Sequence, residues 1–464
     1  MHKLKRRRLI QGFMTSAILG LLYSLRKFWN NQDLISEINF ASKDRLSILQ
    51  GATSSTQTQI SICFHSEQKI KVYAIDSQNT VSNPKLIENT ETDFSHQFLT
   101  VVFNNLSVNE SYSLIIENEM GDILDRRFFK TLDVQKREAI CALISCAHDR
   151  HANIQENMWK SVEKSSPDVL FLLGDNVYVD WNEALPQSGI VDKVHLWNRY
   201  IQIRNLFYLY KMPSLIPTFA IWDDHDTGAD NSYKDSPLIS EATHIFNIAF
   251  PQFNIDSILK RTYGIGSHLK LFGLEILMMD SHSFRTLKTD PNPSQWGAQQ
   301  EAWVESTLAN SSSPIWIMNG NQFFGAYRQG KESYEWIHPS SFNDWFVKKI
   351  KASPKPVLLT SGDIHYSEIQ RIEPDIAGYP LYEITSSSIH SKKKYLENKM
   401  GIPQDDVIQS NVKQRRCAVT GEFNFILVKI KTTSDDFIVE ASSIGLNSTE
   451  YFNKTFLISK ALET

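Results

Sequence analysis

The chain has 464 residues, of which 22% are charged and 41% hydrophobic, ordinary values for a globular protein. This composition excludes a disordered chain, a collagen-like fibre and a coiled-coil rod, and the 4 cysteines are too few for a disulfide-built scaffold. The net charge of -4 excludes a globally basic nucleic-acid binder. Residues 1–32, however, contain 7 Lys and Arg and no acidic residue, which leaves 41 basic against 52 acidic residues in the rest of the chain.

The basic N-terminal segment has the pattern of an export signal, a positive stretch before an apolar run. Arg6-Arg7-x-Leu9-Ile10 resembles a twin-arginine signal, which is read by the machinery that exports folded proteins. The uncharged run Leu9–Leu25 has 17 residues, the lower limit for a membrane span, so an uncleaved anchor and an ordinary amphipathic helix stay open. We therefore predict that residues 1–32 are an export signal or membrane anchor. The protein would be periplasmic, at the cell surface or membrane-anchored, facing away from the cytoplasm.

Residues 42–132 contain short alternating runs separated by polar turns. Strands are predicted at 59–63, 70–74, 98–103, 112–116 and around 128–129. Several strands at such short spacing predict a β-sandwich of the fibronectin type III or immunoglobulin kind. No cluster of ligand-type residues falls in this stretch, so its expected role is structural.

A different pattern begins after Lys136. Apolar runs alternate with helical stretches, in the order 139–145, 151–164, 169–173 and 298–308. Nearly continuous apolar strands that end in polar loops are typical of an α/β layered domain, whose sites form where loops leave the strand ends. A strand-rich stretch at 422–459 closes the chain without a separate core. We therefore predict one large α/β domain over residues 137–462.

Five polar loops in this domain each follow an apolar run and contain potential metal ligands. They are Ser145-Cys146, Gly174-Asp175-Asn176-Val177-Tyr178, Trp222-Asp223-Asp224-His225-Asp226, Gly320-Asn321-Gln322 and Ser361-Gly362-Asp363-Ile364-His365-Tyr366. Taken singly, each has a structural explanation, such as an Asx-turn or helix cap for an aspartate and buried filler for a cysteine. Together, at the ends of successive strands, they should converge on one edge of the sheet.

The chemistry of these side chains favours a two-metal site. Asp363 and His365 are two residues apart, so an extended loop points both toward the same side. Asp175 and Tyr178 are three apart and need a turn between them to meet one ion. A two-metal site requires a carboxylate shared by ions about 3.5–4 Å apart. Thiolate and phenolate ligands favour a transition ion, whereas oxygen ligands suit calcium, magnesium or manganese.

In their order, the motifs resemble the alkaline phosphatase D (PhoD-like) family of calcineurin-like metallophosphoesterases. The resemblance covers residues 139–388 through the five loops, and Gly297–Trp303, Glu332–Trp336 and Glu383–Ser387 are similar to further landmarks of that family. The preceding β-domain and the twin-arginine-like head also resemble the family's layout. The resemblance implies an α/β sandwich of two β-sheets flanked by helices, with an N-terminal all-β sandwich.

The resemblance also implies how the ligands divide between two ions. The first ion, ferric iron, would be held by Cys146, Asp175, Tyr178 and His365. Asp175 would bridge to a second, harder ion, calcium, whose other oxygens would come from Asp224, Asp363 and Asn321. Another divalent pair is the alternative. Asn321 has a second interpretation, because Gly-Asn-Gln can instead fix its loop by hydrogen bonding.

Phosphoester hydrolysis requires a nucleophile, neutralisation of charge and a proton for the leaving group. The resemblance implies that two metals activate a hydroxide, since metal binding lowers the pKa of water from about 15.7 to about 7. His225 is the expected general acid, and Asp226 either orients it or makes an unrelated loop hydrogen bond. Arg285 is the expected phosphate clamp. The family often has a second arginine where His282 stands, so a substrate contact at His282 is left open.

Two neighbours of Cys146 are expected to lie outside the site. Cys141 is five residues earlier on one strand, and an odd separation puts it on the opposite face. A disulfide between the two is disfavoured because extended residues five apart are too distant. His148 is predicted to be a solvent-exposed loop histidine, with an outer-shell partner of the site as the alternative.

We therefore expect an exported, metal-dependent phosphoesterase that hydrolyses phosphodiesters, phosphomonoesters or both. The alternatives are an alkaline phosphomonoesterase and a catalytically silent surface protein on the same fold, although every proposed ligand position holds a competent ligand. The expected partners are a phosphoester substrate, the twin-arginine export machinery and, through the N-terminal segment, a membrane. Nucleic acid is not expected, because no basic stripe with interleaved aromatics lies near the motifs.

Overall fold

The computed structural model describes residues 45–89, 94–180, 191–325, 333–387, 389–391, 407–409 and 414–461. The chain forms two units, Met1–Arg45 and Leu46–Thr464, and the architecture below is that of the second. The predicted export signal or anchor lies outside the described residues. Within the described ranges, no helix is long and apolar enough to cross a membrane.

The first strands of this unit form two four-stranded antiparallel sheets. One sheet has the order β1-β2-β6-β5, from β1 (Ser47–Thr53), β2 (Thr58–His65), β5 (Lys85–Asn89) and β6 (His96–Phe103). The other has the order β4-β3-β7-β8, from β3 (Lys71–Ile75), β4 (Val81–Ser82), β7 (Ser111–Glu117) and β8 (Ile123–Lys130). Alternate residues such as Ile60, Ile62 and Leu114 fill the core between them.

A six-stranded sheet follows, in the order β11-β10-β9-β21-β22-β23. Its strands are β9 (Glu138–Ile144), β10 (Val169–Leu173), β11 (Thr218–Ile221), β21 (Asn424–Thr432), β22 (Phe437–Gly445) and β23 (Glu450–Ile458). The first three run parallel to one another. The C-terminal strands are antiparallel and join the sheet through the pairing of β21 with β9.

A nine-stranded mixed sheet has the order β12-β13-β14-β15-β16-β18-β17-β20-β19. Its strands are β12 (Leu259–Arg261), β13 (Ser267–Leu271), β14 (Leu274–Met278), β15 (Ile315–Met318), β16 (Val357–Ser361), β17 (Ser367–Ile372), β18 (Leu381–Thr385), β19 (Val407–Gln409) and β20 (Gln414–Thr420). The central strands β14, β15, β16 and β18 are parallel.

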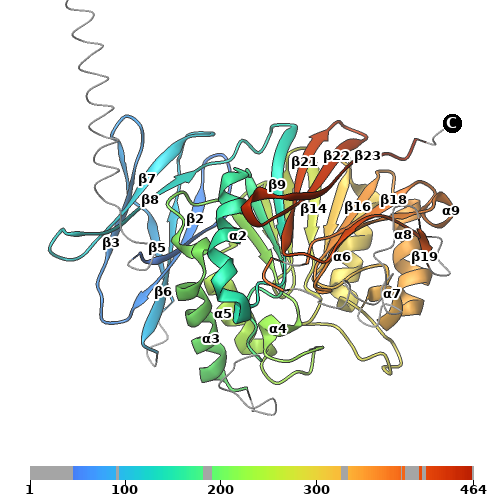
Figure 1. Cartoon of the computed structure of the whole chain (residues 1–464), viewed down its shortest axis with the longest axis horizontal. Coiled ribbons are helices and arrows are strands. Elements are labelled where there is room, and N and C mark those ends of the chain that lie inside the picture. The colour runs from blue at the N-terminus through green and yellow to red at the C-terminus, as the bar shows by residue number, and fades with distance from the viewer. Residues whose placement is uncertain are drawn as a thin grey trace, which may run out of the picture. The chain divides into compact units, whose positions relative to one another are not determined.

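The main apolar core lies between the two larger sheets, where the rings of Phe171 and Trp316 pack 5.7 Å apart. Side chains alternate along β15, so Trp316 faces this core whereas Ile317 faces a second core on the other side of the sheet. Helices α6 (Gly297–Asn310), α7 (Tyr334–Ile337) and α8 (Val347–Ala352) supply the residues that complete the second core, and Figure 1 shows α6 and α8 beside the nine-stranded sheet.

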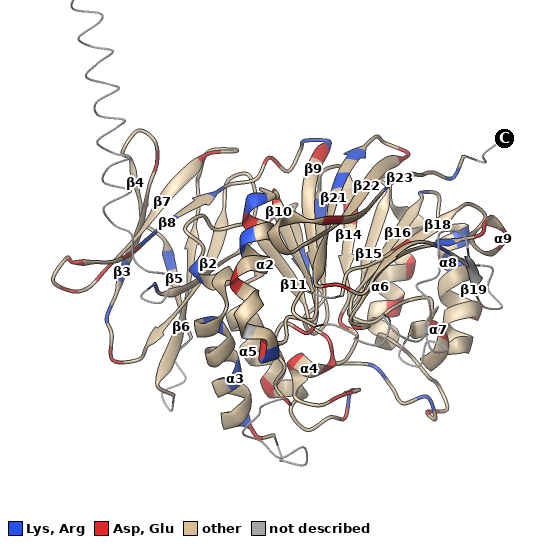
Figure 2. Cartoon of the chain, viewed as in Figure 1, with Lys and Arg blue, Asp and Glu red and all other residues tan. Residues whose placement is uncertain are grey.

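The described ranges also contain the α-helices α2 (Ala152–Lys164), α3 (Lys193–Leu206), α4 (Asp224–Thr227), α5 (Ile239–Ala249) and α9 (Pro374–Ala377). Helix α2 buries Met158, Trp159 and Val162 in the main core. The predicted fold class, an α/β sandwich of two sheets flanked by helices with an all-β sandwich before it, is confirmed. The parallel strands end at the edge of the sheets where α4 begins, and Figure 2 shows acidic residues along the loops there.

Candidate metal centre

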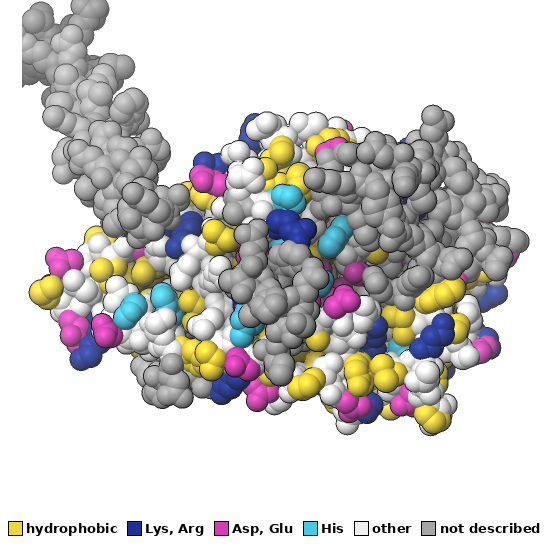
Figure 3. All heavy atoms as spheres, turned by 60° about the horizontal axis from the view of Figure 1, so that its bottom comes forward, with side chains coloured by type: hydrophobic (Ala, Val, Ile, Leu, Met, Phe, Trp, Pro, Cys, Tyr) yellow, Lys and Arg dark blue, Asp and Glu magenta, His cyan; other side chains and the backbone are white. Residues whose placement is uncertain are grey.

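The ends of the parallel strands bring the five predicted loops together. In the six-stranded sheet, Cys146 follows β9, Asp175 follows β10, and Asp224 begins α4 directly after β11. In the nine-stranded sheet, Asn321 follows β15 and Asp363 follows β16. Figure 3 turns this edge of the molecule toward the viewer and shows histidine side chains at the surface among charged groups.

Two glycines allow the loops of the two sheets to approach closely. A Cβ atom on Gly320 would lie 2.7 Å from the carboxylate of Asp223, and a Cβ atom on Gly362 would lie 2.8 Å from the carbonyl oxygen of Leu173. Real Cβ atoms essentially never come that near to other atoms. The glycines of Gly-Asn321-Gln and Ser-Gly-Asp363 are therefore steric requirements of the loop junction.

A first group of ligand-type atoms surrounds the sulfur of Cys146. Cys146, Asp175 and His365 each offer one atom within 4.8 Å of the others. The sulfur lies 3.5 Å from Oδ2 of Asp175. The hydroxyl of Tyr178 donates to the same carboxylate oxygen at 2.8 Å and lies 2.9 Å from Nε2 of His365. The four residues assigned to the first ion thus form one connected cluster.

A second group contains Asp175 again, with Asp224 and His225. Oδ1 of Asp175 is buried and has no hydrogen-bond donor among the described residues. A buried carboxylate oxygen without a partner costs roughly 1–3 kcal/mol or more, so it calls for a water or an ion. A carboxylate that belongs to two ligand groups and keeps one oxygen bare fits a bridging position between two cations.

Four of the predicted ligands hold an unusual backbone conformation. Positive φ angles occur at Cys146 (59°), Asp175 (54°), Asp363 (73°) and His365 (61°). Residues other than glycine rarely adopt this region, and each such residue costs of the order of 1–3 kcal/mol. Strain of this kind clusters where side chains must be aimed at a ligand, which agrees with a metal centre at these loops.

The same loops concentrate negative charge inside the protein. Burial raises the pKa of Asp175 to about 6, and burial with neighbouring carboxylates holds the pKa values of Asp223 and Asp226 well above their usual range. Burial and Asp175 likewise raise the pKa of the Cys146 thiol and of the Tyr178 phenol. A bound cation would favour the ionised form of each of these groups, so the donor set fits metal ions.

The orienting partner of His225 is Asp180, which the sequence interpretation missed. Nδ1 of His225 lies 2.7 Å from Oδ1 of Asp180. The carboxylate of Asp226 instead accepts the backbone N–H groups of Asn176, Val177 and Asp223 at 2.9–3.0 Å. Asp226 therefore fixes the loop, which was the alternative explanation, and its suggested role in orienting His225 is corrected.

Asn321 is held by amide donors. Its Oδ1 accepts hydrogen bonds from Nδ2 of Asn319 at 2.7 Å and from Nε2 of Gln295 at 3.0 Å. The indole N–H of Trp296 donates to Oδ1 of Asn319, and this bond fixes the orientation of the Asn319 amide. Both lone pairs of the Asn321 oxygen are thus in use, which favours the loop-fixing interpretation over the metal ligand.

Asp363 lies close to the first group without forming part of it. Among the described residues, it belongs to neither three-residue ligand group. Its carboxylate interacts electrostatically with Cys146, and its backbone N–H donates to Oγ of Ser145 at 3.4 Å. The structure thus places Asp363 beside Cys146, and its assignment to the second ion stays a prediction.

Arg285 and His282 differ sharply in what they contact. No hydrogen bond or ion pair joins the guanidinium of Arg285 to another described residue, although it is near enough to Asp223 and Asp224 to interact electrostatically with both. His282 is buried, with Nε2 2.5 Å from Asp223 and Nδ1 2.9 Å from the carbonyl of Ser232. Both ring nitrogens of His282 thus contact protein atoms, whereas the described residues leave the guanidinium donors of Arg285 available to a substrate.

The prediction that His148 is solvent-exposed is wrong. Its side chain is buried, and the ring packs against Tyr178 with centroids 4.2 Å apart. The ring of His225 packs against Tyr178 at 4.3 Å. The phenol ring therefore contacts two imidazoles, which the histidine-rich run after Cys146 could have indicated.

The cysteines behave as the geometry of a strand predicts. Cys141 and Cys146 are both buried and both free. Cys141 lies within β9, and its side chain belongs to the main core. It takes no part in the two ligand groups found among the described residues.

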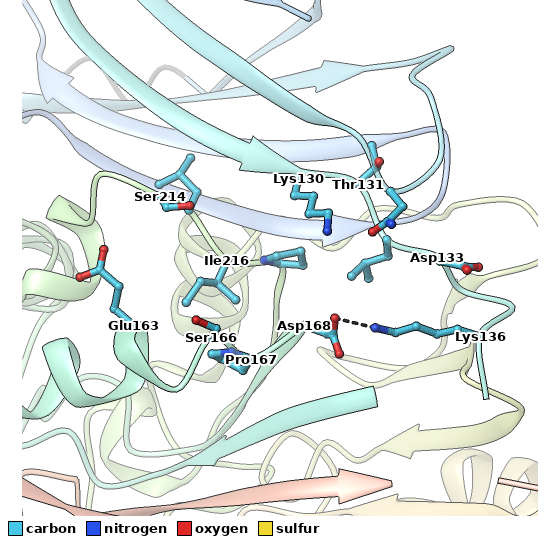
Figure 4. Close-up of a pocket in the computed structure, with 14 residues that line it drawn as sticks. Lys130, Thr131, Asp133, Lys136, Glu163, Ser166, Pro167, Asp168, Ser214 and Ile216 are labelled. Carbon is cyan, nitrogen blue, oxygen red and sulfur yellow. Dashed lines mark ion pairs between the residues drawn. The ribbon is translucent and has the colours of Figure 1, made fainter. Parts of the chain in front are cut away.

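A separate cavity of about 420 Å³ lies at the other ends of the same strands. Its wall includes Asp168, which directly precedes β10, and Pro217, which directly precedes β11. Figure 4 shows Lys130 from β8 and the ion pair between Lys136 and Asp168 at this cavity. Because it lies at the amino ends of β10 and β11, it is not part of the candidate metal centre.

Comparisons with known proteins identify the fold. No family model matches the sequence, and no curated protein matches it. The solved structure of PhoD matches with a TM-score of 0.66 and 15% identity, over 91% of this chain and 92% of that chain. Two further solved structures match with TM-scores of only 0.15 and carry no argument. One is the sensor domain of the anti-sigma factor RsgI4 from Pseudobacteroides cellulosolvens, with 17% identity over 19% of this chain and 95% of that chain. The other is amylomaltase from Corynebacterium glutamicum, with 12% identity over 34% of this chain and 24% of that chain.

At 15% identity the likeness to PhoD is a likeness of fold, and it extends over the β-sandwich as well as the α/β part. The resemblance seen in the ordered motifs is confirmed at that level. The chain has the fold of PhoD.

Proposed function

We propose that this chain is an exported, metal-dependent phosphoesterase that hydrolyses phosphodiesters, phosphomonoesters or both. The observation that carries the proposal is the Asp175 carboxylate, which belongs to two ligand groups and keeps one buried oxygen without a donor among the described residues. A shared carboxylate of this kind is what a two-metal hydrolase requires. The PhoD fold supports the same assignment.

The first ion, ferric iron, would be held by Cys146, Asp175, Tyr178 and His365. The second ion, calcium, would be held by Asp175, Asp224 and Asp363, and another divalent pair is the alternative. Sulfur and phenolate suit a transition ion and carboxylates suit a hard cation, so the donor set supports two unlike ions. When bound, such ions supply Lewis-acid activation of water and neutralise phosphoryl charge.

Two residues of the chain would act on the substrate directly. Arg285 has a planar guanidinium that suits phosphoryl oxygens and forms no hydrogen bond or ion pair with another described residue. His225 would donate the proton to the leaving oxygen from Nε2, because Asp180 engages Nδ1. Burial lowers the pKa of His225, but the surrounding carboxylates outweigh burial and raise it well above its usual range. A raised pKa favours the protonated form of the ring, which a general acid requires.

The first experiment measures metal content and substrate range on the same purified protein. We expect two metal ions per chain and turnover of aryl phosphodiesters, aryl phosphomonoesters or both. Asp175→Asn should lose metal and turnover together, because it removes the shared charge. Metal-free protein that hydrolyses neither class would refute the proposal and favour the catalytically silent surface protein.

Export is tested separately, through the arginines of the N-terminal segment. Replacement of Arg6, Arg7 and Arg8 by lysine keeps the charge but removes the twin-arginine pattern, so activity should remain inside the cell. Cell fractionation measures the result. Normal export of the triple variant would refute the twin-arginine route and leave a general signal or an anchor.

A further inference from the structure

Two serine hydroxyls lie against the sulfur of Cys146. Oγ of Ser387 is 2.9 Å from the sulfur, and Oγ of Ser145 is 3.2 Å from it. All three side chains are buried. The serines come from different parts of the chain, Ser145 from the end of β9 and Ser387 from the segment after β18.

The neighbours of each hydroxyl favour donation of its proton to the sulfur. Oγ of Ser387 accepts the backbone N–H of His365 at 2.7 Å, and Oγ of Ser145 accepts the backbone N–H of Asp363 at 3.4 Å. Each oxygen is therefore an acceptor toward the 363–365 loop, and its own proton is available for the sulfur. A sulfur that binds a metal carries no proton, so only the hydroxyls can donate.

We propose that Ser145 and Ser387 are positioning residues that donate two hydrogen bonds to the metal-bound sulfur of Cys146 and thereby set its strength as a ligand. This inference rests on the proposed metal site. Hydrogen bonds to a thiolate draw electron density from the sulfur and tune the metal that it binds. The same hydroxyls also tie the Cys146 loop to the 363–365 loop, so one pair of groups controls both the electron donation and the position of the ligand.

Cobalt(II) is a suitable probe, because a cobalt–thiolate bond absorbs in the near ultraviolet whether or not the protein turns over substrate. The full chain is stripped of metal and titrated with Co²⁺ as wild type, Ser387→Ala and Ser145→Ala. Without a donated hydrogen bond the sulfur electrons lie higher in energy, so the thiolate-to-cobalt band should move to longer wavelength in both variants. Cobalt affinity should fall roughly 10-fold or more, because the lost tie between the Cys146 loop and the 363–365 loop outweighs the stronger donation by the sulfur.

Ser386→Ala is the matched control. Ser386 is the neighbour of Ser387 and equally buried, but its hydroxyl donates to the carbonyl of Leu143 at 2.6 Å and accepts the N–H of Ile426 at 3.2 Å. Loss of this hydroxyl should leave the cobalt band in place. Ser387→Thr keeps a hydroxyl and should restore the wild-type band, which separates the hydrogen bond from general damage to folding.

The outcomes separate this inference from the proposed function. If the cobalt–thiolate band of the wild type stays unchanged in Ser387→Ala and Ser145→Ala, the proposed role of the two hydroxyls is refuted. The proposed metal site is not. Equal shifts in Ser386→Ala and Ser387→Ala would also overturn it, because the effect would not depend on contact with the sulfur. No thiolate band in the wild type would overturn both the pair and the metal site on which it rests.

Discussion

Tyr178 connects the two ligand groups at the scale of single residues. Its hydroxyl contacts Asp175 and His365, and its ring packs against His225. A phenol has a reference pKa of about 10, and burial raises that of Tyr178 further. Only a strongly polarising cation would keep it ionised at neutral pH, so the residue reports on the metal beside it.

Tyr178→Phe removes the hydroxyl and keeps the ring. If ferric iron occupies the first position, the purified wild-type protein should be coloured by charge transfer from phenolate or thiolate. The variant should lose or shift that band and turn over more slowly, whereas Cys146→Ala should lose the iron. Visible absorption and metal analysis measure both effects. A colourless, fully active wild type that contains only zinc or calcium would contradict the iron assignment.

Asp180 and Asp226 are both aspartates near His225, but the loss of each should affect a different property, turnover for Asp180 and stability for Asp226. Asp180→Asn weakens the hold on Nδ1 of His225, so turnover should fall roughly 10- to 100-fold, most for substrates with poor leaving groups. Asp226→Asn disturbs a cap on three backbone N–H groups and should lower the free energy of unfolding by roughly 1–3 kcal/mol.

Steady-state rates on activated and unactivated esters measure the effect of Asp180→Asn on turnover. Thermal unfolding measures the effect of Asp226→Asn on stability. Metal content should stay near the wild-type level in Asp180→Asn. Equal losses on both kinds of ester in that variant would argue against a general acid that Asp180 orients.

At the scale of the elements, the close approach of the loop after β15 to Asp223 depends on Gly320. Gly320→Ala would place a methyl group against Asp223, so stability should fall by roughly 1–3 kcal/mol and metal retention should fall with it. Gly121→Ala is the control for metal retention. Its φ of +89° strains any side chain, so stability should fall, but no atom lies within 4 Å of the added Cβ and metal should be retained. Calorimetry and metal analysis compare the two, and an unaffected Gly320→Ala protein would contradict the tight junction.

The sequence predicted the elements whose signals are local. Alternation located β2, β3, β6 and β7, and the apolar runs located β9 and β10. The polar loops that follow the strands predicted which side chains would meet, because the carboxyl ends of parallel strands lie at the same edge of a sheet. Strand β1 was missed, since its sequence SILQGAT contains polar residues that are buried by partners distant in the chain.

The errors at the site have the same origin. Adjacency in sequence left two roles open for Asp226, as the partner of His225 or in a loop hydrogen bond. The turn at α4 directs Asp226 to the backbone, and the histidine is bound by Asp180 instead. His148 was expected in solvent, yet it is covered through a contact with Tyr178. Which hydrogen bonds a polar side chain makes depends on tertiary contacts that no local pattern specifies.

For the whole molecule, bound metal should contribute to the stability of the fold. A ligand that binds only the folded state stabilises it by RT ln(1 + L/Kd), where L is the free ligand concentration. Removal of metal by a chelator should therefore lower the unfolding temperature, and the shift should largely disappear in Asp175→Asn, which already lacks the shared ligand. Calorimetry with and without chelator measures this. A chelator shift as large in the variant as in the wild type would place the stabilising metal elsewhere.

The pairing of β21 with β9 has a consequence for the order of events during biosynthesis. Every proposed ligand lies before residue 366, yet β9, the strand that leads to Cys146, has β21 (Asn424–Thr432) along one whole side. A nascent chain that has already delivered all the ligands still lacks the neighbour of that strand. We therefore expect the centre to be completed only after β21 has been synthesised and has paired with β9.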